Sequence, residues 1–283
     1  MKFYEEFKSH FTAFVKAIAT DDNEWIIKGF IDVYKKIYPM TSDTKVVSKI
    51  IELMIFPEIL KFGQEKNYEI FVAEHQNHYP DITFRNLEKG ELIAVDIKSS
   101  YRKTENTING MTLGAFTGYF RNRDSTKNIK FKYCDYSAHY VLGVIYTRND
   151  SSDEAFNGEM KTYQIKDLVR IPSVVCDFKF FLQEKWRIAS DKPGSGNTKN
   201  IGSIKDIERL VEGKGVFSKL GKEIFDDYWM NYLTNDMAKS IDSEVPYTNI
   251  KNYLKWRSKI KLEENAIDET MELLEDEDEN DGE

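Results

Sequence analysis

A short apolar run rich in β-branched residues, Glu91 to Lys98, most constrains how this chain can fold. It follows a turn-like Glu-Lys-Gly stretch, and this pattern indicates a buried β-strand. Because successive side chains of a strand point to opposite faces, Asp96 and Lys98 share one face and Val95 and Ile97 lie on the other. The run therefore predicts a strand whose end presents a carboxylate and an ammonium group side by side.

A second carboxylate lies upstream of this strand. Asp81 follows a proline and opens another strand-like stretch, which a hairpin at residues 86–90 joins to the first. If the two strands pair antiparallel, their outer ends meet and the carboxylates of Asp81 and Asp96 converge. Two converging carboxylates repel each other unless a cation lies between them, and their oxygens suit Mg²⁺.

These two acids and one lysine suffice for hydrolysing a phosphodiester. A divalent ion lowers the pKa of its bound water and stabilises charge on the phosphate, while Lys98 orients the attacking water or adds positive potential. The spacing alone is a loose signal, and a solvated Asp–Lys pair at the exposed end of a strand is the simpler interpretation.

Charge is distributed unevenly along the 283 residues, whose formal net charge is −8 at pH 7. Residues 263–283 contain 12 acidic residues and no basic ones, which leaves 40 basic against 36 acidic residues over 1–262. We expect residues 1–262 to form a single, mildly basic domain and residues 263–283 a disordered acidic tail. The tail either solubilises the protein or competes with DNA for a basic cleft.

The chain has the features of a cytoplasmic protein. No apolar run is long enough to span a bilayer, and the N-terminus lacks the apolar region of a signal peptide, so no membrane partner is expected. Cys134 and Cys176 are expected to be free buried thiols. The four histidines lack metal-ligand spacing and are assigned to packing or to the surface: His10, His75, His78 and His139.

Apolar spacing and turn residues predict the other elements. Helices are expected over residues 1–38 with a break at 21–23, over 46–62 with a kink at Pro57 and an end at Gly63, and over 111–122. Strands are expected over 140–148, which is central because it is almost wholly apolar, and over 174–181 and 184–189 at sheet edges or in a second small sheet. Residues 149–159 form a polar loop, and residues 204–262 form helices and turns.

Two further stretches bear on function. Glu52 lies among apolar residues of the helix over 46–62, and either faces the metal centre or lies on the exposed stripe, which helix geometry favours. Residues 194–203, rich in Gly, Ser, Asn and Thr, show neither helix nor strand character. Glycines let a backbone approach a ligand closely, and Asn and Thr can read an adenine edge and a thymine methyl, although a flexible linker has the same composition.

Eight segments, in order, carry a family resemblance: residues 37–39, 42–46, 76–81, 96–98, 126–129, 146–148, 194–204 and 211–215. Together they resemble the EcoRV-like type II restriction endonucleases of the PD-(D/E)xK nuclease superfamily, over about residues 37 to 260. The resemblance implies an α/β (mixed α+β) fold in which a mixed β-sheet is flanked by helices, with a smaller DNA-recognition region. It divides residues 1–262 into an N-terminal dimer region (1–38), a catalytic core (39–150) and a recognition region (170–262).

The resemblance also implies roles for particular residues. Asp81 and Asp96 would bind metal, Lys98 would assist the attacking water, and Glu52 would be an accessory catalytic and metal-binding acid. Residues 194–198 would read outer bases in the major groove, and Gln76 and Asn77 would enter the minor groove. The DNA-binding set is Thr44, Lys45, Gln76, Asn77, Ser99, Ser100, Lys127, Gly194, Ser195, Gly196, Asn197, Thr198 and Asn200.

The implied enzyme is a homodimer that cuts both strands of a palindrome with Mg²⁺, for which Mn²⁺ can substitute. Because residues 194–198 are identical to those of the family, the expected site is GATATC. The expected cut is blunt, at the centre of the site, and leaves 5′-phosphates. The central TA step of this site kinks easily. A cognate methyltransferase would act on the same site. Ser99 and Ser100 replace two threonines of the family pattern, and the acidic tail has no counterpart there.

Two other functions compete with this one. A repair or phage nuclease of the same superfamily would have relaxed specificity, which the intact 194–198 loop argues against. A non-catalytic DNA-binding dimer would keep the fold, but it would not need two repelling carboxylates beside a phosphate.

Overall fold

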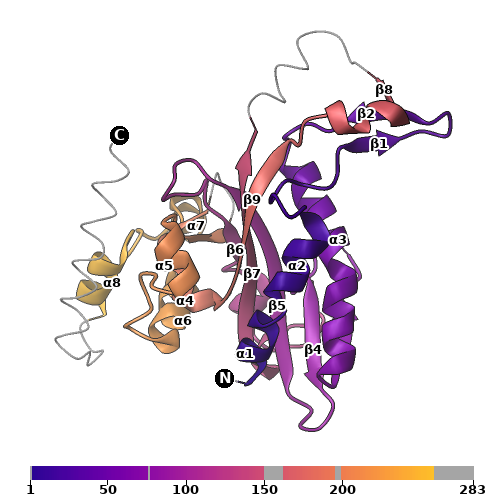
Figure 1. The fold of residues 1–283 in the computed structure, drawn as a ribbon. Coiled ribbons are helices and arrows are strands. Elements are labelled where there is room, and N and C mark those ends of the chain that lie inside the picture. Colours follow the sequence, from indigo (N-terminus) through magenta and orange to yellow (C-terminus); the bar gives the residue numbers. More distant parts are fainter. Residues whose placement is uncertain (1, 76, 150–161, 195–198, 258–283) are drawn as a thin grey trace.

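A five-stranded mixed sheet forms the centre of the computed structural model, which describes residues 2–75, 77–149, 162–194 and 199–257 (Figure 1). The strand order is β3-β4-β5-β7-β9, and the bounds are Tyr68–Val72, Ile82–Asn86, Leu92–Tyr101, Tyr136–Arg148 and Val175–Glu184. β5 pairs antiparallel with β4 and parallel with β7, while β9 pairs antiparallel with β7 and forms one edge. The predicted mixed sheet flanked by helices is therefore confirmed.

The β4–β5 hairpin forms where the turn residues predicted it. The Asn86 side chain accepts hydrogen bonds from the main-chain N–H groups of Glu88 and Lys89, and Gly90 has a φ of 71°, which favours glycine. The predicted strand at 140–148 lies within β7, which has a partner on each side. The strand predicted over 174–181 is edge strand β9.

Three helices cover one face of the sheet, namely α1 (Lys2–Lys8), α2 (Phe11–Ile18) and α3 (Thr44–Glu65) (Figure 1). Their apolar side chains, including those of Phe7, Phe14 and Ile55, pack with Val95 and Ile97 of β5 in one core cluster. Asp43 caps the N-terminus of α3, because its carboxylate accepts hydrogen bonds from the main-chain N–H groups of residues 45 and 46. This core fixes the face of β5 that points away from Asp96 and Lys98.

A second layer packs on the opposite face of the sheet and builds its own core cluster. It contains a three-stranded sheet in the order β10-β11-β6, with bounds Ala189–Pro193, Asn200–Ser203 and Thr112–Ala115. Its helices are α4 (Lys185–Ile188), α5 (Ile207–Glu212), α6 (Lys222–Asn231), α7 (Asn235–Ser240) and α8 (Ile250–Trp256). Two short 3-10 helices, η1 (Gly118–Phe120) and η2 (Tyr133–Asp135), complete it.

A small antiparallel sheet projects from the body as an arm (Figure 1). It contains β1 (Gly29–Ile31), β2 (Lys36–Pro39) and β8 (Tyr163–Gln164), in the order β1-β2-β8, and is followed by the 3-10 helix η4 (Ile165–Arg170). Several of its apolar side chains are exposed, including Val33 at 89% and Val169 at 94%.

Several secondary-structure predictions are wrong. Residues 29–31 and 36–39 form strands β1 and β2 where a helix was predicted, and residues 111–122 form β6 and η1 because Leu113 and Phe116 pack into the second core, with a φ of 86° at Gly114 between them. Residues 185–188 form one helical turn in place of a strand, and residues 200–203 form strand β11 in place of a loop. α3 also continues through Pro57 and past Gly63 to Glu65.

Other expectations concern the cysteines, the tail and membranes. Cys134 and Cys176 are free, as predicted, but Cys134 is exposed and Cys176 only half-buried, so the prediction of buried thiols is wrong. The acidic tail 263–283 and most of the loop at 149–159 lie outside the described residues. Within the described ranges, none of the helices has both the length and the apolar character needed to cross a membrane.

Candidate active site

The hairpin brings the two predicted carboxylates together at its open end. Ile82 of β4 is opposite Val95 of β5, so Asp81 extends β4 toward Asp96. The main-chain N–H of Ile97 donates a hydrogen bond to Asp81 Oδ2 at 2.7 Å, which ties the Asp81 side chain to the neighbouring strand. The predicted convergence of Asp81 and Asp96 is confirmed in this geometry.

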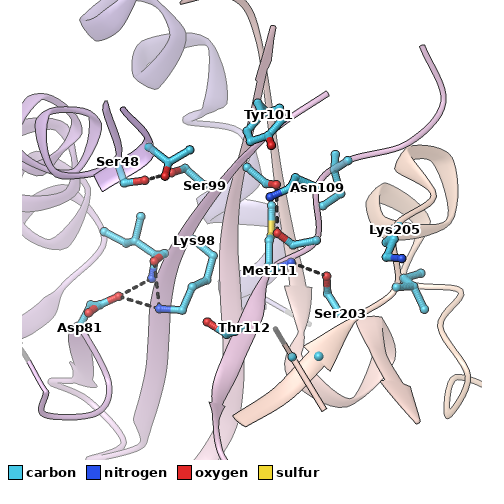
Figure 2. A pocket seen from close by; sticks show the side chains of 18 of the residues that line it. Ser48, Asp81, Lys98, Ser99, Tyr101, Asn109, Met111, Thr112, Ser203 and Lys205 are labelled. Carbon is cyan, nitrogen blue, oxygen red and sulfur yellow. Dashed lines mark hydrogen bonds and ion pairs between the residues drawn. The ribbon is translucent and has the colours of Figure 1, made fainter. Parts of the chain in front are cut away.

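Lys98 lies between oxygen atoms of both strands (Figure 2). Its Nζ is 2.6 Å from Asp96 Oδ2, 3.6 Å from Asp81 Oδ2 and 3.1 Å from the Ile97 carbonyl oxygen. The Asp96 side chain is 8% exposed, whereas those of Lys98 and Asp81 are 25% and 32% exposed. The site is therefore a partly open cluster in which three oxygens surround one cation.

Burial and mutual repulsion perturb these groups. Burial, followed by the nearby Asp96 charge, raises the pKa of Asp81 to about 7, against the opposing effect of Lys98. Burial lowers the pKa of Lys98, but the Asp96 and Asp81 carboxylates outweigh it and raise that pKa above its ordinary value. Perturbed groups clustered in a cleft are typical of functional sites.

Glu52 lies on α3 at the wall of the same cleft. Its carboxylate pairs with Lys49 at 2.7 Å, and its side chain is 30% exposed. Its charge contributes to the raised pKa of Lys98, after the larger effects of burial and the two aspartates. Among the described residues, no three His, Cys, Asp or Glu side chains are arranged to hold one ion, so Glu52 does not join Asp81 and Asp96 in a three-carboxylate cluster.

The cluster opens into a cleft of about 2120 Å³. This volume exceeds the 300–1,000 Å³ typical of small-molecule pockets, so the cleft fits a larger ligand. α3 and β5 form one wall, and further lining comes from residues 72–75, 81–82, 103–112, 190–194 and 202–209. Its lining includes the basic residues Lys45, Lys49, Lys98, Lys103, Lys192, Lys205 and Arg209.

Polar side chains connect the elements around the cleft. Ser99 Oγ of β5 lies 2.6 Å from Ser48 Oγ of α3 (Figure 2), and Ser100 Oγ donates to the Gly110 carbonyl at 3.0 Å. On the far wall, the N–H of Met111 donates to Ser203 Oγ at 3.0 Å (Figure 2). These bonds restrain serine side chains that line the cleft.

The structure places the predicted DNA-binding residues in three groups. Those that line the cleft are Thr44, Lys45, Ser99, Ser100 and Gly194. Those that are described but do not line it are Asn77, Lys127 and Asn200. The main-chain carbonyl of Asn200 accepts a hydrogen bond from the Gly194 N–H at 2.9 Å. Those outside the described residues are Gln76, Ser195, Gly196, Asn197 and Thr198.

Comparisons with known proteins agree with this geometry. The family model for restriction endonuclease EcoRV matches residues 21–258. The chain belongs to the EcoRV family of restriction endonucleases. One relative in the EcoRV family, the type II restriction enzyme EcoRV of Escherichia coli, is 39% identical over 244 residues, which cover 86% of this chain and 95% of that enzyme.

Membership of the EcoRV family decides between the functions that the sequence left open. The chain is a site-specific deoxyribonuclease of the type II restriction class, with DNA as its substrate, and not a non-catalytic DNA-binding protein. Enzymes of the EcoRV type use divalent metal ions, which the oxygen-rich cluster around Lys98 suits.

Sequence reasoning missed several residues of this site. The basic side chains of Lys103, Lys205 and Arg209 line the cleft, the first two from loops and Arg209 from α5, and the sequence did not single them out. For the part of the cleft wall at residues 103–112, the sequence offered one indication, a polar stretch between Tyr101 and Thr112 that is rich in Asn and Thr.

Proposed function

We propose that this enzyme is a homodimer that cuts GATATC bluntly at its centre with Mg²⁺, leaving 5′-phosphates. The observation that carries the proposal is the Asp81–Lys98–Asp96 cluster, whose Asp81 and Lys98 line a cleft larger than a small-molecule pocket. The cluster supports phosphodiester hydrolysis, and the cleft supports a polymeric substrate with charged phosphates.

The donor set around Lys98 suits Mg²⁺. Oxygens of Asp81, Asp96 and the Ile97 carbonyl already surround one cation, the Lys98 ammonium, and hard oxygen ligands are those that Mg²⁺ and Mn²⁺ prefer. Asp81 and Asp96 would hold the ion, with water and phosphate oxygens completing its shell, and Glu52 would act as an accessory acid from the cleft wall. When bound, the ion lowers the pKa of water and stabilises charge on the phosphate.

The protein's own groups would then do the remaining work. Asp96 is held by Lys98, and Asp81 by the Ile97 N–H, so both carboxylates are oriented before a ligand arrives. With a divalent ion held by these two carboxylates, the Lys98 ammonium would orient the attacking water and offset charge on the phosphate.

Recognition would come from the cleft walls and the loop that ends the β10 strand. Residues 194–198 would read outer base pairs, Gln76 and Asn77 would enter the minor groove, and the side chains of Thr44, Lys45, Ser99 and Ser100 would lie along the backbone, with Lys127 and Asn200 as further contacts. The flexible TA step at the centre of GATATC lets bending contribute specificity without direct base contact.

The projecting arm supports a homodimer. Its exposed apolar side chains include those of Phe30, Ile31, Val33, Tyr34, Leu168 and Val169. Apolar side chains exposed together on a projecting element suit an interaction site, and a second copy is the occupant because a palindromic site is matched by two-fold symmetry.

Plasmid digestion tests the proposal. A plasmid with a single GATATC is incubated with wild type or Asp96→Ala, in Mg²⁺, Mn²⁺ or EDTA, and the ends are sequenced. We expect wild type to give blunt linear product with either ion, and we expect no such product from Asp96→Ala or in EDTA. Methylation of the same plasmid at GATATC should prevent cutting. Linear product with ends at another sequence would overturn the assigned site while leaving the nuclease intact.

A further inference from the structure

Lys185 is a buried lysine on the side of the sheet that carries Asp96. It is the first residue of α4 and is 2% exposed. Its ammonium lies over the rings of Tyr79, Phe120 and Tyr133, at 5.4, 5.2 and 5.9 Å from their centroids. Among the residues that the structure describes, its Nζ has no hydrogen-bond partner.

This arrangement does not favour folding. Taking an ammonium group out of water is costly, and aromatic faces return only part of that cost. Burial accordingly lowers the pKa of Lys185 to about 8, against the attraction of Asp96 and then Asp226. A methionine would fill the same aromatic cage without that cost.

Asp96 is the carboxylate whose charge attracts Lys185 most strongly. The face of β5 that bears Asp96 also bears Ala94, which packs in the same core cluster as Tyr79 and Tyr133. After burial, the Asp96 charge is the largest influence raising the pKa of Tyr119, whose ring stacks on that of Tyr79 at 5.1 Å. In the sheet register Asp96 is opposite Val141 of β7, and Val141 is opposite Gln183 of β9, two residues before Lys185. Lys185 therefore leaves β9 on the face of the sheet that bears Asp96, whose other neighbour is the Lys98 ammonium in contact with it.

We propose that Lys185 is a positioning residue of the active site: its caged ammonium stabilises the Asp96 carboxylate from the core side, so that the opposite side stays available to Lys98 and the metal ion. The role in cleavage rests on the proposed metal-dependent function, but the electrostatic coupling between the two side chains does not. Two measurements therefore test the two parts separately.

The first measurement is a thermal-unfolding cycle at pH 7 in EDTA. Lys185→Met is combined with Asp96→Asn and, as a matched comparison, with Asp226→Asn. We expect Lys185→Met alone to unfold at or above the wild-type temperature, and to raise the unfolding temperature more in the Asp96→Asn background than in wild type. Any of three results would overturn the proposal. Lys185→Met could unfold at a lower temperature than wild type, or it could raise the unfolding temperature equally in the wild-type and Asp96→Asn backgrounds. The third is a larger rise in the Asp226→Asn background than in the Asp96→Asn background.

The second measurement is single-turnover cleavage of GATATC DNA at saturating enzyme. We expect Lys185→Met to cleave 10–100-fold more slowly, as for other residues that orient metal ligands, with unchanged DNA affinity measured in Ca²⁺. Lys179→Met, at an exposed position of β9, removes the same charge and should cleave at the wild-type rate. A wild-type rate for Lys185→Met would refute the role in cleavage, whereas failure of wild type itself to cut GATATC would refute only the proposed function.

Discussion

The ammonium nitrogen of Lys98 lies 2.6 Å from Oδ2 of Asp96, on the same face of one strand. This contact places a cation where the proposed chemistry needs both a metal ligand and a water-orienting group. It also makes Lys98 the most direct test of that chemistry.

Replacing Lys98 with methionine should abolish most cleavage while leaving DNA binding intact. Groups that position or activate the attacking water contribute on the order of 10²–10⁴ in rate, so a loss of that size is expected in single-turnover assays with Mg²⁺. Lys89→Met, in the exposed hairpin turn, serves as the matched control and should retain wild-type activity. Binding of GATATC DNA in Ca²⁺, followed by fluorescence anisotropy, should be within a few-fold of wild type for both variants; a Lys98→Met enzyme that cuts normally would remove Lys98 from the mechanism.

The raised pKa of Asp81 predicts a pH-dependent stability in the absence of metal. Burial and the Asp96 charge raise that pKa from 3.8 to about 7, so the folded protein binds more protons than the unfolded chain between these values. Stability therefore falls as pH rises through this window, and the destabilisation is complete above about pH 7. In EDTA, Asp81→Asn should gain about 1–3 kcal/mol at pH 8, allowing for its partial exposure, and nothing below pH 4. Urea denaturation at both values measures this, and an equal gain at both would show that ionisation is not the cause.

Gly143 of β7 is opposite Lys98 in the parallel register, with the Phe181 ring packed against it. A Cβ at this position would lie 2.0 Å from ring atoms of Phe181, which is 1% exposed. Gly143→Ala should therefore cost about 1–3 kcal/mol of unfolding free energy through overpacking. In a Phe181→Leu background the cost should shrink, because the clashing ring is gone, and an undiminished cost would point to another origin.

The arm predicts the oligomeric state. Val169 is 94% exposed and is one of the apolar side chains of the arm that we assign to contact with the second copy. Val169→Asp should convert the protein to monomers in sedimentation velocity, keep its unfolding temperature within a few degrees, and lose concerted double-strand cleavage. Leu87→Asp, at a 57% exposed position in the β4–β5 turn, should remain dimeric. If Val169→Asp sedimented like wild type, the arm would not be the interface.

The catalytic hairpin could be predicted because its signals are local. The β-branched run up to Lys98 and the Asn86–Gly90 turn specify two strands, and the period of two then specifies which side chains face the cleft. The same reasoning failed where tertiary packing overrides local preference. Residues 111–122 contain enough apolar side chains for a helix, yet Leu113 and Phe116 are drawn into the second core and the chain extends as β6.

Lys185 could not be identified from the sequence at all. It lies in one helical turn directly after β9, in a stretch whose composition also fits a strand. Only the fold brings its ammonium to the rings of Tyr79 and Tyr133 and near Asp96, residues far away in the chain. The exposed arm is a similar case, because Val33 and Val169 are distant in sequence and are brought into the same arm by the pairing of β2 with β8.

The catalytic carboxylates and much of the cleft rim belong to separately anchored parts of the molecule. Asp81 and Asp96 depend on the β4–β5 pair, which is hydrogen-bonded on both sides within the central sheet, whereas the rim at residues 190–194 and 202–209 is built on the outer layer around β10 and β11. Substitutions in the outer layer can therefore alter what the cleft reads without disturbing the atoms that cut. A scaffold divided in this way is open to the acquisition of new target sequences, since a change of specificity does not require catalysis to be reinvented.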